Sequence, residues 1–189
     1  IFRGDPDREM FLETLGEAVA RFGLTLRAWC LMPNHYHLIL ETPMGNLSRG
    51  VGWLQTTYTI RFNRRHRRCG HLFQNRYKSI VCEEDAYFRE LLRYVHLNPL
   101  RAGEVDSLME LDHYPWSGHA VIVGLLTNDW QDRDYALKWF GRREKEAQAA
   151  YRAYARTHPV AGHARRVVRD ILACRTGDLG VFVCACPEG

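Results

Sequence analysis

Apolar residues near the start of the chain recur at the three- and four-residue intervals of one helix face. Over residues 5–22 this face is formed by Met10, Phe11, Leu15, Val19 and Phe22. Asp5 is a candidate N-cap, Pro6 suits the first helical turn, and Gly23 follows the last apolar position. The pattern predicts an amphipathic helix that ends at Gly23.

Two apolar runs follow, and the turn between them indicates a β-hairpin. Residues 24–32 and 35–41 are both rich in aliphatic residues, and the sequence Met-Pro-Asn separates them. Helical spacing then returns over residues 47–65, where Asn46 is a candidate N-cap. The apolar positions of this second helix are Val51, Leu54, Tyr58 and Phe62.

The second half of the chain is mostly helical by the same criteria. An extended segment at 71–82 precedes a helix from about Glu84 to Leu97, which Pro99 helps to end. Short helices are expected within 113–124 and 129–141, and a longer one over 142–157. This order of elements predicts an α+β fold with an antiparallel sheet.

Two histidines in the second strand are the first candidate for chemistry. Side chains of a strand alternate between its faces, so His35 and His37 share a face with Ile39. Two imidazoles at this spacing can converge on one metal ion and leave other coordination positions open. The alternative is a half-buried strand with two polar positions and no ligand.

Composition narrows the class of protein. The chain has 189 residues, 46% of them hydrophobic, which suits one domain with or without a small appended one. No apolar run is long enough to span a bilayer, and no secretory signal opens the chain. The six cysteines form no C-x-x-C pair, so we expect reduced thiols and a cytoplasmic location.

Positive charge is clustered rather than spread. Residues 60–78 contain seven Arg or Lys residues, no acidic residue, and interleaved aromatic residues. Basic side chains neutralise phosphates and aromatic faces stack on bases, so the cluster favours nucleic-acid binding over a merely solvated loop. The candidate DNA contacts are Arg61, Arg64, Arg65, Arg67, Arg68, Phe73, Arg76 and Lys78.

A tyrosine and an amide on the next helix complete a candidate reaction centre. Tyr94 and Asn98 are four residues apart, so they share a helix face, although they could equally be a core aromatic and a helix stop. With a metal pair and a basic surface, they suggest attack of a tyrosine hydroxyl on a DNA phosphate. A phenol of pKa ~10 needs activation near a metal for this reaction. No glycine-rich phosphate loop is present, so no nucleotide cofactor is expected.

Four sequence blocks, in order, resemble one protein family. "LMPNHYHLILETP", "GHLFQNRYKSIV", "LLRYVHLNPLRAG" and "YPWSG" are similar to the REP-associated tyrosine transposases, which are single-tyrosine HUH endonucleases. The resemblance implies that His35 and His37 ligate Mg²⁺ or Mn²⁺ with Asn98 as third ligand. It also implies that Tyr94 is the nucleophile, leaving a 5′-phosphotyrosine and a free 3′-OH.

The resemblance also implies an architecture and a partner. The expected fold is ferredoxin-like, with the His strand near the centre of an antiparallel sheet and a further strand that is missing or precedes Ile1. We expect this domain over 1–118, a helical extension over 119–157 and a tail of uncertain structure over 158–189. The implied partner is single-stranded DNA with REP-like hairpins, bound by a monomer or homodimer associated with the bacterial nucleoid, with no membrane involved.

Two other functions compete with this one. A metal-dependent hydrolase of small molecules with an H-x-H strand needs a barrel of ~250 residues, for which this chain is too short. A catalytically inactive or domesticated protein that still binds DNA hairpins is compatible with the same residues and stays open as an alternative.

Overall fold

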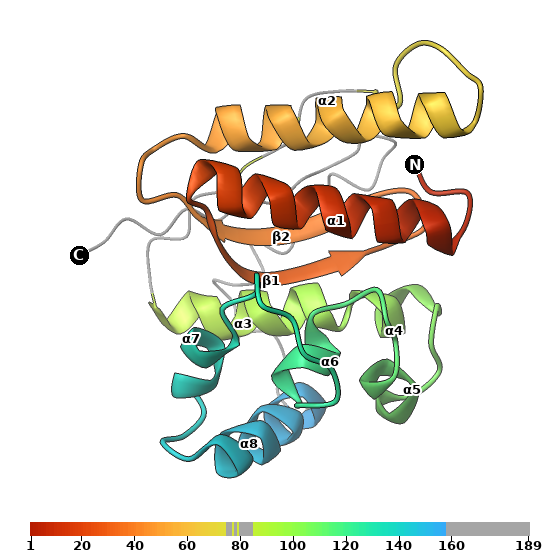
Figure 1. The fold of residues 1–189 in the computed structure, drawn as a ribbon. Helices are drawn as coiled ribbons and strands as arrows, with labels where there is room; N and C mark the ends of the chain where they lie inside the picture. The colour runs from red at the N-terminus through yellow and green to blue at the C-terminus, as the bar shows by residue number, and fades with distance from the viewer. Residues whose placement is uncertain (75–76, 78, 80–84, 158–189) are drawn as a thin grey trace.

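The computed structural model describes residues 1–74, 77, 79 and 85–157. Helices cover both faces of a small sheet, which gives three layers (Figure 1). Helices α1 (Asp5–Phe22) and α2 (Leu47–Arg65) lie on one face, and α3 (Asp85–His96) lies on the other. The fold is therefore α+β, as predicted.

The sheet is the predicted hairpin. Strands β1 (Thr25–Leu31) and β2 (Tyr36–Glu41) are antiparallel, with Cys30 opposite His37. Within the described residues the sheet has these two strands only. The outer edge of β1 is met by two single bridges, from Ser117 to Cys30 and from Gln131 to Leu26. The wider sheet implied by the resemblance is thus not contained in this part of the chain.

Each face of the hairpin belongs to a separate core. Tyr36, Leu38 and Leu40 of β2 are buried against apolar residues of α1 and α2. Ile39 points to the opposite face, where it packs with apolar residues of α3 and of the later helices. The alternation predicted from the sequence is therefore present, and it turns His37 toward α3.

The first helix begins differently from the prediction. Gly4, not Asp5, is the N-cap residue, and Asp5 lies inside the first turn where it pairs with Arg8 at 2.9 Å. The predicted capping role of Asp5 is therefore wrong. The capping position is the residue before the first helical residue, and because the helix starts at Asp5, that position is Gly4. The predicted end is confirmed, since Gly23 has a left-handed φ of 59°.

Asn46 stands at the predicted N-cap of α2 but uses its side chain elsewhere. No side-chain hydrogen bond caps the helix. Instead, the amide nitrogen of Asn46 donates to the backbone oxygen of Phe22, at 2.7 Å. The start of α2 is thus tied to the end of α1.

The helix expected from about Glu84 to Leu97 is confirmed as α3, which ends at His96. A short helix that the sequence did not predict, α4 (Asn98–Ala102), follows directly after Leu97. Pro99 explains the break between the two helices, because it has no N–H to donate to the carbonyl of Val95. A bond from the Leu97 amide to the Arg93 oxygen, at 2.9 Å, still continues the first helix.

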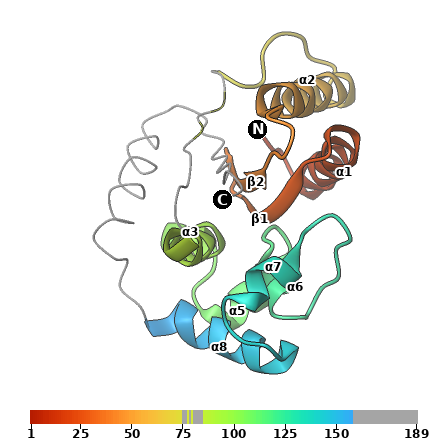
Figure 2. The ribbon, with the colours of Figure 1, turned by 90° about the vertical axis from the view of Figure 1, so that its left-hand side faces the viewer.

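Four further helices follow in the part of the chain that the structure describes, up to residue 157. The sequence did not predict α5 (Leu108–Asp112), whereas α6 (His119–Ile122), α7 (Arg133–Lys138) and α8 (Glu144–Thr157) lie within predicted segments. The last three share one core with α3 and the sheet (Figure 2). No helix in the described ranges is long and apolar enough to cross a membrane.

A chain of buried polar groups runs between these helices. The Tyr151 hydroxyl lies 2.8 Å from Nδ1 of His96 and 2.9 Å from Nδ1 of His119. Nε2 of His119 is 2.8 Å from Asp112. Burial lowers the pKa of both imidazoles, that of His96 well below its ordinary 6.5, and for His119 it outweighs the opposing effect of Asp112.

This network makes stability depend on pH in a defined direction. Below about pH 6.5 an unfolded chain protonates these histidines, whereas the folded protein protonates them only at lower pH, so over this interval the unfolded state binds more protons. We predict that the free energy of unfolding falls as pH is lowered from 7 to 5, by up to ~1.4 kcal/mol per pH unit for each imidazole.

Urea unfolding at several pH values measures this slope. His119→Gln removes one titrating group and should flatten the slope. An equal slope in that variant and in the unmodified protein would contradict the prediction.

Candidate functional site

The two predicted metal ligands face each other at the turn of the hairpin. His37 lies on β2, and His35 lies just before that strand begins. Their Nε2 atoms are 3.1 Å apart, and their rings are nearly perpendicular, at 87°. The spacing is short because both side chains leave the same strand face.

A hydrogen bond to Asn34 determines which ring nitrogen of His35 can bind a metal ion. Its Nδ1 lies 2.7 Å from the side-chain oxygen of Asn34. An amide oxygen only accepts hydrogen bonds, so Nδ1 carries the proton and Nε2 has a lone pair. Asn34 therefore orients the imidazole in the way that outer-sphere groups orient metal-binding histidines.

The pair fits a divalent metal ion. Two nitrogens at ~2.1 Å from a shared ion lie roughly 3.0–3.4 Å apart for bond angles between octahedral and tetrahedral. The observed 3.1 Å lies in this interval. The described part of the chain contains no cluster of three His, Cys, Asp or Glu residues.

Tyr94 lies beside this pair. Its ring centroid is 5.9 Å from that of His37, with the rings at 77°. The Arg101 guanidinium, from α4, lies 5.2 Å from the same tyrosine ring. Tyr94 is 1% exposed, so a DNA strand could not reach its hydroxyl without movement of the residues that cover it.

Asn98 is placed close to Tyr94 in the chain but on the next element. It is fully buried and is the first residue of α4, one turn after Tyr94. The structure thus brings together His35, His37 and Tyr94. The role of Asn98 as a metal ligand stays a prediction.

Sequence reasoning missed Arg101. It stands in the quoted block "LLRYVHLNPLRAG", yet nothing in the letters separates it from the other arginines. Its guanidinium, from α4, lies over the ring of Tyr94, from α3. A proline directly after Asn98 was the available signal for the break between these two helices.

The fold supplies acidic partners to part of the basic segment. Glu17 of α1 binds Arg61 at 3.0 Å, and Asp7 lies 3.5 Å from Arg65 and 2.8 Å from His66. These ion pairs could not be predicted from the sequence, because the acidic residues on α1 precede the basic segment by about fifty residues. Arg61 and Arg65 therefore help to hold α2 against α1.

Other arginines of the segment point to solvent. Arg64 and Arg67 are exposed, and neither has an acidic partner within ion-pair distance in the described ranges. Arg68 is also exposed and donates to the backbone oxygen of His71 at 3.2 Å. Arg76 and Lys78 lie outside the described residues.

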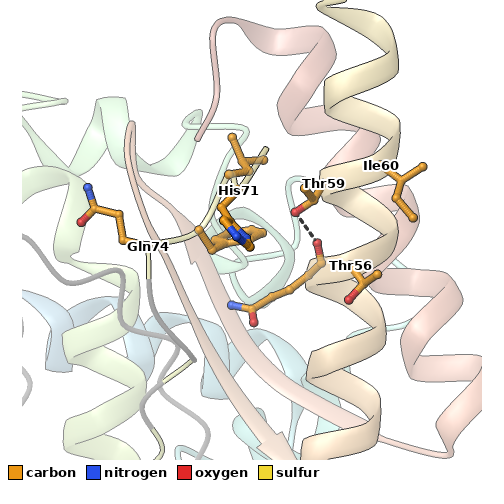
Figure 3. A pocket seen from close by; sticks show the side chains of 8 residues that line it. Thr56, Thr59, Ile60, His71 and Gln74 are labelled. Atoms are coloured by element: carbon orange, nitrogen blue, oxygen red, sulfur yellow. Dashed lines mark hydrogen bonds between the residues drawn. The ribbon is translucent and has the colours of Figure 1, made fainter. Parts of the chain in front are cut away.

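A groove lies beside these arginines. It separates α2 from the segment 71–74 and has a volume of about 550 Å³ (Figure 3). Phe73 anchors the segment by packing edge-on against Tyr36, with centroids 6.1 Å apart. Ile60 is 62% exposed on the groove, and Arg64 follows one helical turn later. The lining residues are Gln55, Thr56, Thr59, Ile60, His71, Leu72, Phe73 and Gln74.

The basic end of α2 and the histidine pair lie at the same end of the layers. Arg65 contacts Asp7 at the start of α1, and the neighbouring Arg8 lies 5.4 Å from the Trp116 ring. The backbone oxygen of Trp116 accepts from Leu31, the last residue of β1. Figure 1 shows the end of α2 and the β1–β2 turn on the right-hand side.

Comparisons with known proteins agree with the resemblance. The family model described as "Transposase IS200 like" matches residues 1–98. A curated protein of Haemophilus influenzae, named "Putative REP-associated tyrosine transposase", is 24% identical over 116 residues, which are 54% of this chain and 64% of that protein. The matched region thus spans less than two thirds of the length of that relative. No solved structure matches the chain significantly.

The geometry of the pair predicts metal binding that depends on both histidines. His37→Ala should weaken Mn²⁺ binding severely, and Asn34→Ala should weaken it by roughly 10-fold, because outer-sphere partners typically contribute 10–100-fold. Titration followed by electron paramagnetic resonance of free Mn²⁺ measures both affinities.

His71→Ala is the matched control, because this exposed histidine lies on the groove and not at the pair. Equal losses in all three variants, or Mn²⁺ affinity unchanged in His37→Ala, would show that the pair does not bind the ion.

Proposed function

The chain belongs to the IS200-like transposase family, and on that premise we propose that it cuts and rejoins single-stranded DNA with Tyr94 as the nucleophile. The observation that supports this most directly is the grouping of His35, His37 and Tyr94 at one end of the sheet. A histidine pair suited to a divalent ion and a tyrosine on the facing helix are the groups that such a reaction requires.

The proposed reaction exchanges one phosphodiester bond for another. The Tyr94 oxygen attacks the scissile phosphorus, a tyrosine–phosphate bond forms, and the bond from phosphorus to the 3′ oxygen breaks. The phenol proton passes to solvent, and the 3′ oxygen takes up a proton to leave as a hydroxyl. The reverse attack restores DNA, so no oxidant or nucleotide is consumed.

The residues around the site have separate tasks in this proposal. His35 and His37 would hold Mg²⁺ or Mn²⁺, with Asn98 contributing an oxygen. When bound, the ion supplies polarisation of the scissile phosphate and neutralises charge that develops on the leaving oxygen. Arg101, which lies over the Tyr94 ring, is suited to pair with a phosphate of the strand.

The DNA contacts are assigned to the basic end of α2 and the groove. Arg64, Arg67 and Arg68 are exposed there and provide phosphate contacts. The groove offers the amides Gln55 and Gln74 together with apolar surface from Ile60, a combination that accommodates unpaired bases. The name of the Haemophilus influenzae relative supports hairpin DNA of REP elements as the natural substrate.

The burial of Tyr94 favours one alternative. A hydroxyl that is covered in the free protein must be uncovered before it can attack a phosphate. A protein that binds DNA hairpins without cutting them would carry the same fold and the same arginines, and would leave Tyr94 covered.

Replacement of Tyr94 separates the two functions. Tyr94→Phe removes one oxygen and keeps the ring, so the protein should fold and bind a single-stranded hairpin but form no covalent adduct with it. Denaturing gels with labelled DNA and Mn²⁺ detect the adduct. The matched control is Tyr58→Phe, which removes a buried hydroxyl on the opposite face of the sheet.

A covalent adduct in Tyr94→Phe would mean that another residue is the nucleophile. If the unmodified protein binds the hairpin and never forms an adduct, the alternative of binding without cleavage holds.

The exposed arginines should control the salt dependence of binding. Changing Arg64 and Arg67 together to Ala should reduce the slope of log affinity against log salt by roughly 0.7–0.9 for each phosphate that is no longer neutralised. Fluorescence anisotropy with several hairpin sequences measures the slope, and the reduction should be similar for all of them.

Arg61→Ala is the control for this experiment, because that side chain pairs with Glu17 and Thr14 of α1. A slope that stays constant in the double variant, or falls only in Arg61→Ala, would place the DNA elsewhere.

A further inference from the structure

Helix α8 lies outside the part of the chain that the family model matches, yet it contacts the helix that carries Tyr94. The match ends at residue 98, and α8 begins at Glu144. Tyr151 of α8 is fully buried in the core that also contains the apolar face of α3. In Figure 2, α8 lies below α3, on the side away from α1 and α2.

The Tyr151 hydroxyl joins two helices at once. It lies 2.8 Å from His96, the last residue of α3, and 2.9 Å from His119, the first residue of α6. His119 is held in turn by Asp112 at 2.8 Å, and Arg152 lies 3.3 Å from the second oxygen of that carboxylate. Every member of this network except Arg152 and Asp112 is almost completely buried.

Hydrogen-bond chemistry allows one arrangement of protons along the network when both imidazoles are neutral. The Asp112 carboxylate only accepts, so Nε2 of His119 carries the proton and Nδ1 accepts from the tyrosine hydroxyl. That hydroxyl has a single proton to give, so it must accept from Nδ1 of His96. Asp112 thus orients His119, His119 orients the Tyr151 hydroxyl, and that hydroxyl orients His96.

His96 is placed where the backbone of α3 needs support. It lies between Tyr94 and Asn98, immediately before the break at Leu97. Because Pro99 removes a helical hydrogen bond there, the direction of α4 relative to α3 depends on side chains more than in a continuous helix. Residues two apart on a helix point in nearly opposite directions, so His96 faces α8 while Tyr94 faces the sheet.

We propose that Tyr151 is a positioning residue: its hydroxyl holds the end of α3 through His96 and thereby sets the position of Tyr94 and Asn98. This proposal rests on the proposed function for its catalytic consequence, although the structural link itself does not. The helices after residue 118 then form part of the reaction centre's support.

A second tyrosine of α8 provides the matched control. The Tyr154 hydroxyl bonds to Glu90, which is six residues before His96 and away from the break. Tyr151→Phe and Tyr154→Phe each remove one oxygen that joins α8 to α3. Only the first removes a contact at the α3–α4 junction.

The experiment compares the two variants in cleavage and in hydrogen exchange. In Tyr151→Phe we expect the rate of cleavage at saturating hairpin DNA to fall roughly 10- to 100-fold, because misplacement by about 1 Å has effects of this size. DNA affinity should be unchanged. The melting temperatures of the two variants should fall by similar amounts. In Tyr154→Phe, however, the cleavage rate per folded molecule should stay that of the unmodified protein.

Hydrogen exchange of the Leu97 and Arg101 amides, which bridge the junction, tests the link without DNA. Exchange there should accelerate in Tyr151→Phe and not in Tyr154→Phe. Equal acceleration in both, or none in either, would overturn the proposal, as would full cleavage by folded Tyr151→Phe.

Failure of the proposed function gives a different result. If the unmodified protein forms no covalent adduct, cleavage by Tyr94 is refuted, and the exchange measurement alone then decides whether Tyr151 holds the junction.

Discussion

The alternation of side chains along β2 is the constraint on which the rest of the molecule depends. Odd-numbered residues from His35 to Ile39 face α3, and even-numbered residues from Tyr36 to Leu40 face α1 and α2. A shift of register by one residue would bury His37 in the apolar α1–α2 core and turn Tyr36 toward Tyr94. That register would place imidazoles among the apolar residues of α1 and α2, and would place Tyr36, Leu38 and Leu40 on the face toward α3. The free-energy cost of this exchange makes the observed register specific.

Features that depend on local spacing were predictable from the sequence. The boundaries of α2, the hairpin, and the shared face of His35 and His37 follow from periods of 3.6 and 2 residues, which need no knowledge of distant segments. The acidic partners of Arg61 and Arg65 were not predictable, because Glu17 and Asp7 reach them only through the packing of α1 on α2. Helix ends were the least accurate part of the prediction, since either Gly4 or Asp5 is an acceptable N-cap residue and the structure uses Gly4.

The candidate site combines elements of unequal rigidity. His37 sits in a paired strand and is 3% exposed, so neighbours on both sides limit its movement. Tyr94 is buried as well, but it sits one turn before the break between α3 and α4, where Pro99 has no N–H to donate. Under the proposed function, a histidine pair fixed by a strand and a tyrosine near a helix break would allow the nucleophile to be covered at rest and still be aligned when a DNA strand is bound. In our proposal, the buried network around Tyr151 limits how far Tyr94 can move.

The link between Asn46 and Phe22 has a practical consequence for work on this protein. It holds the end of α1 and the start of α2 together independently of the loop between β2 and α2, where Met44 is 78% exposed and Gly45 has a φ of 60°. Helix α2 has 19 residues, so this loop is about 28 Å from the basic end of the same helix. A fluorophore, an affinity tag or new chain termini introduced at residues 43–45 would therefore sit at the end of the molecule opposite the histidine pair. A label or tag there would allow immobilisation or distance measurements with the end that carries the histidine pair left unobstructed.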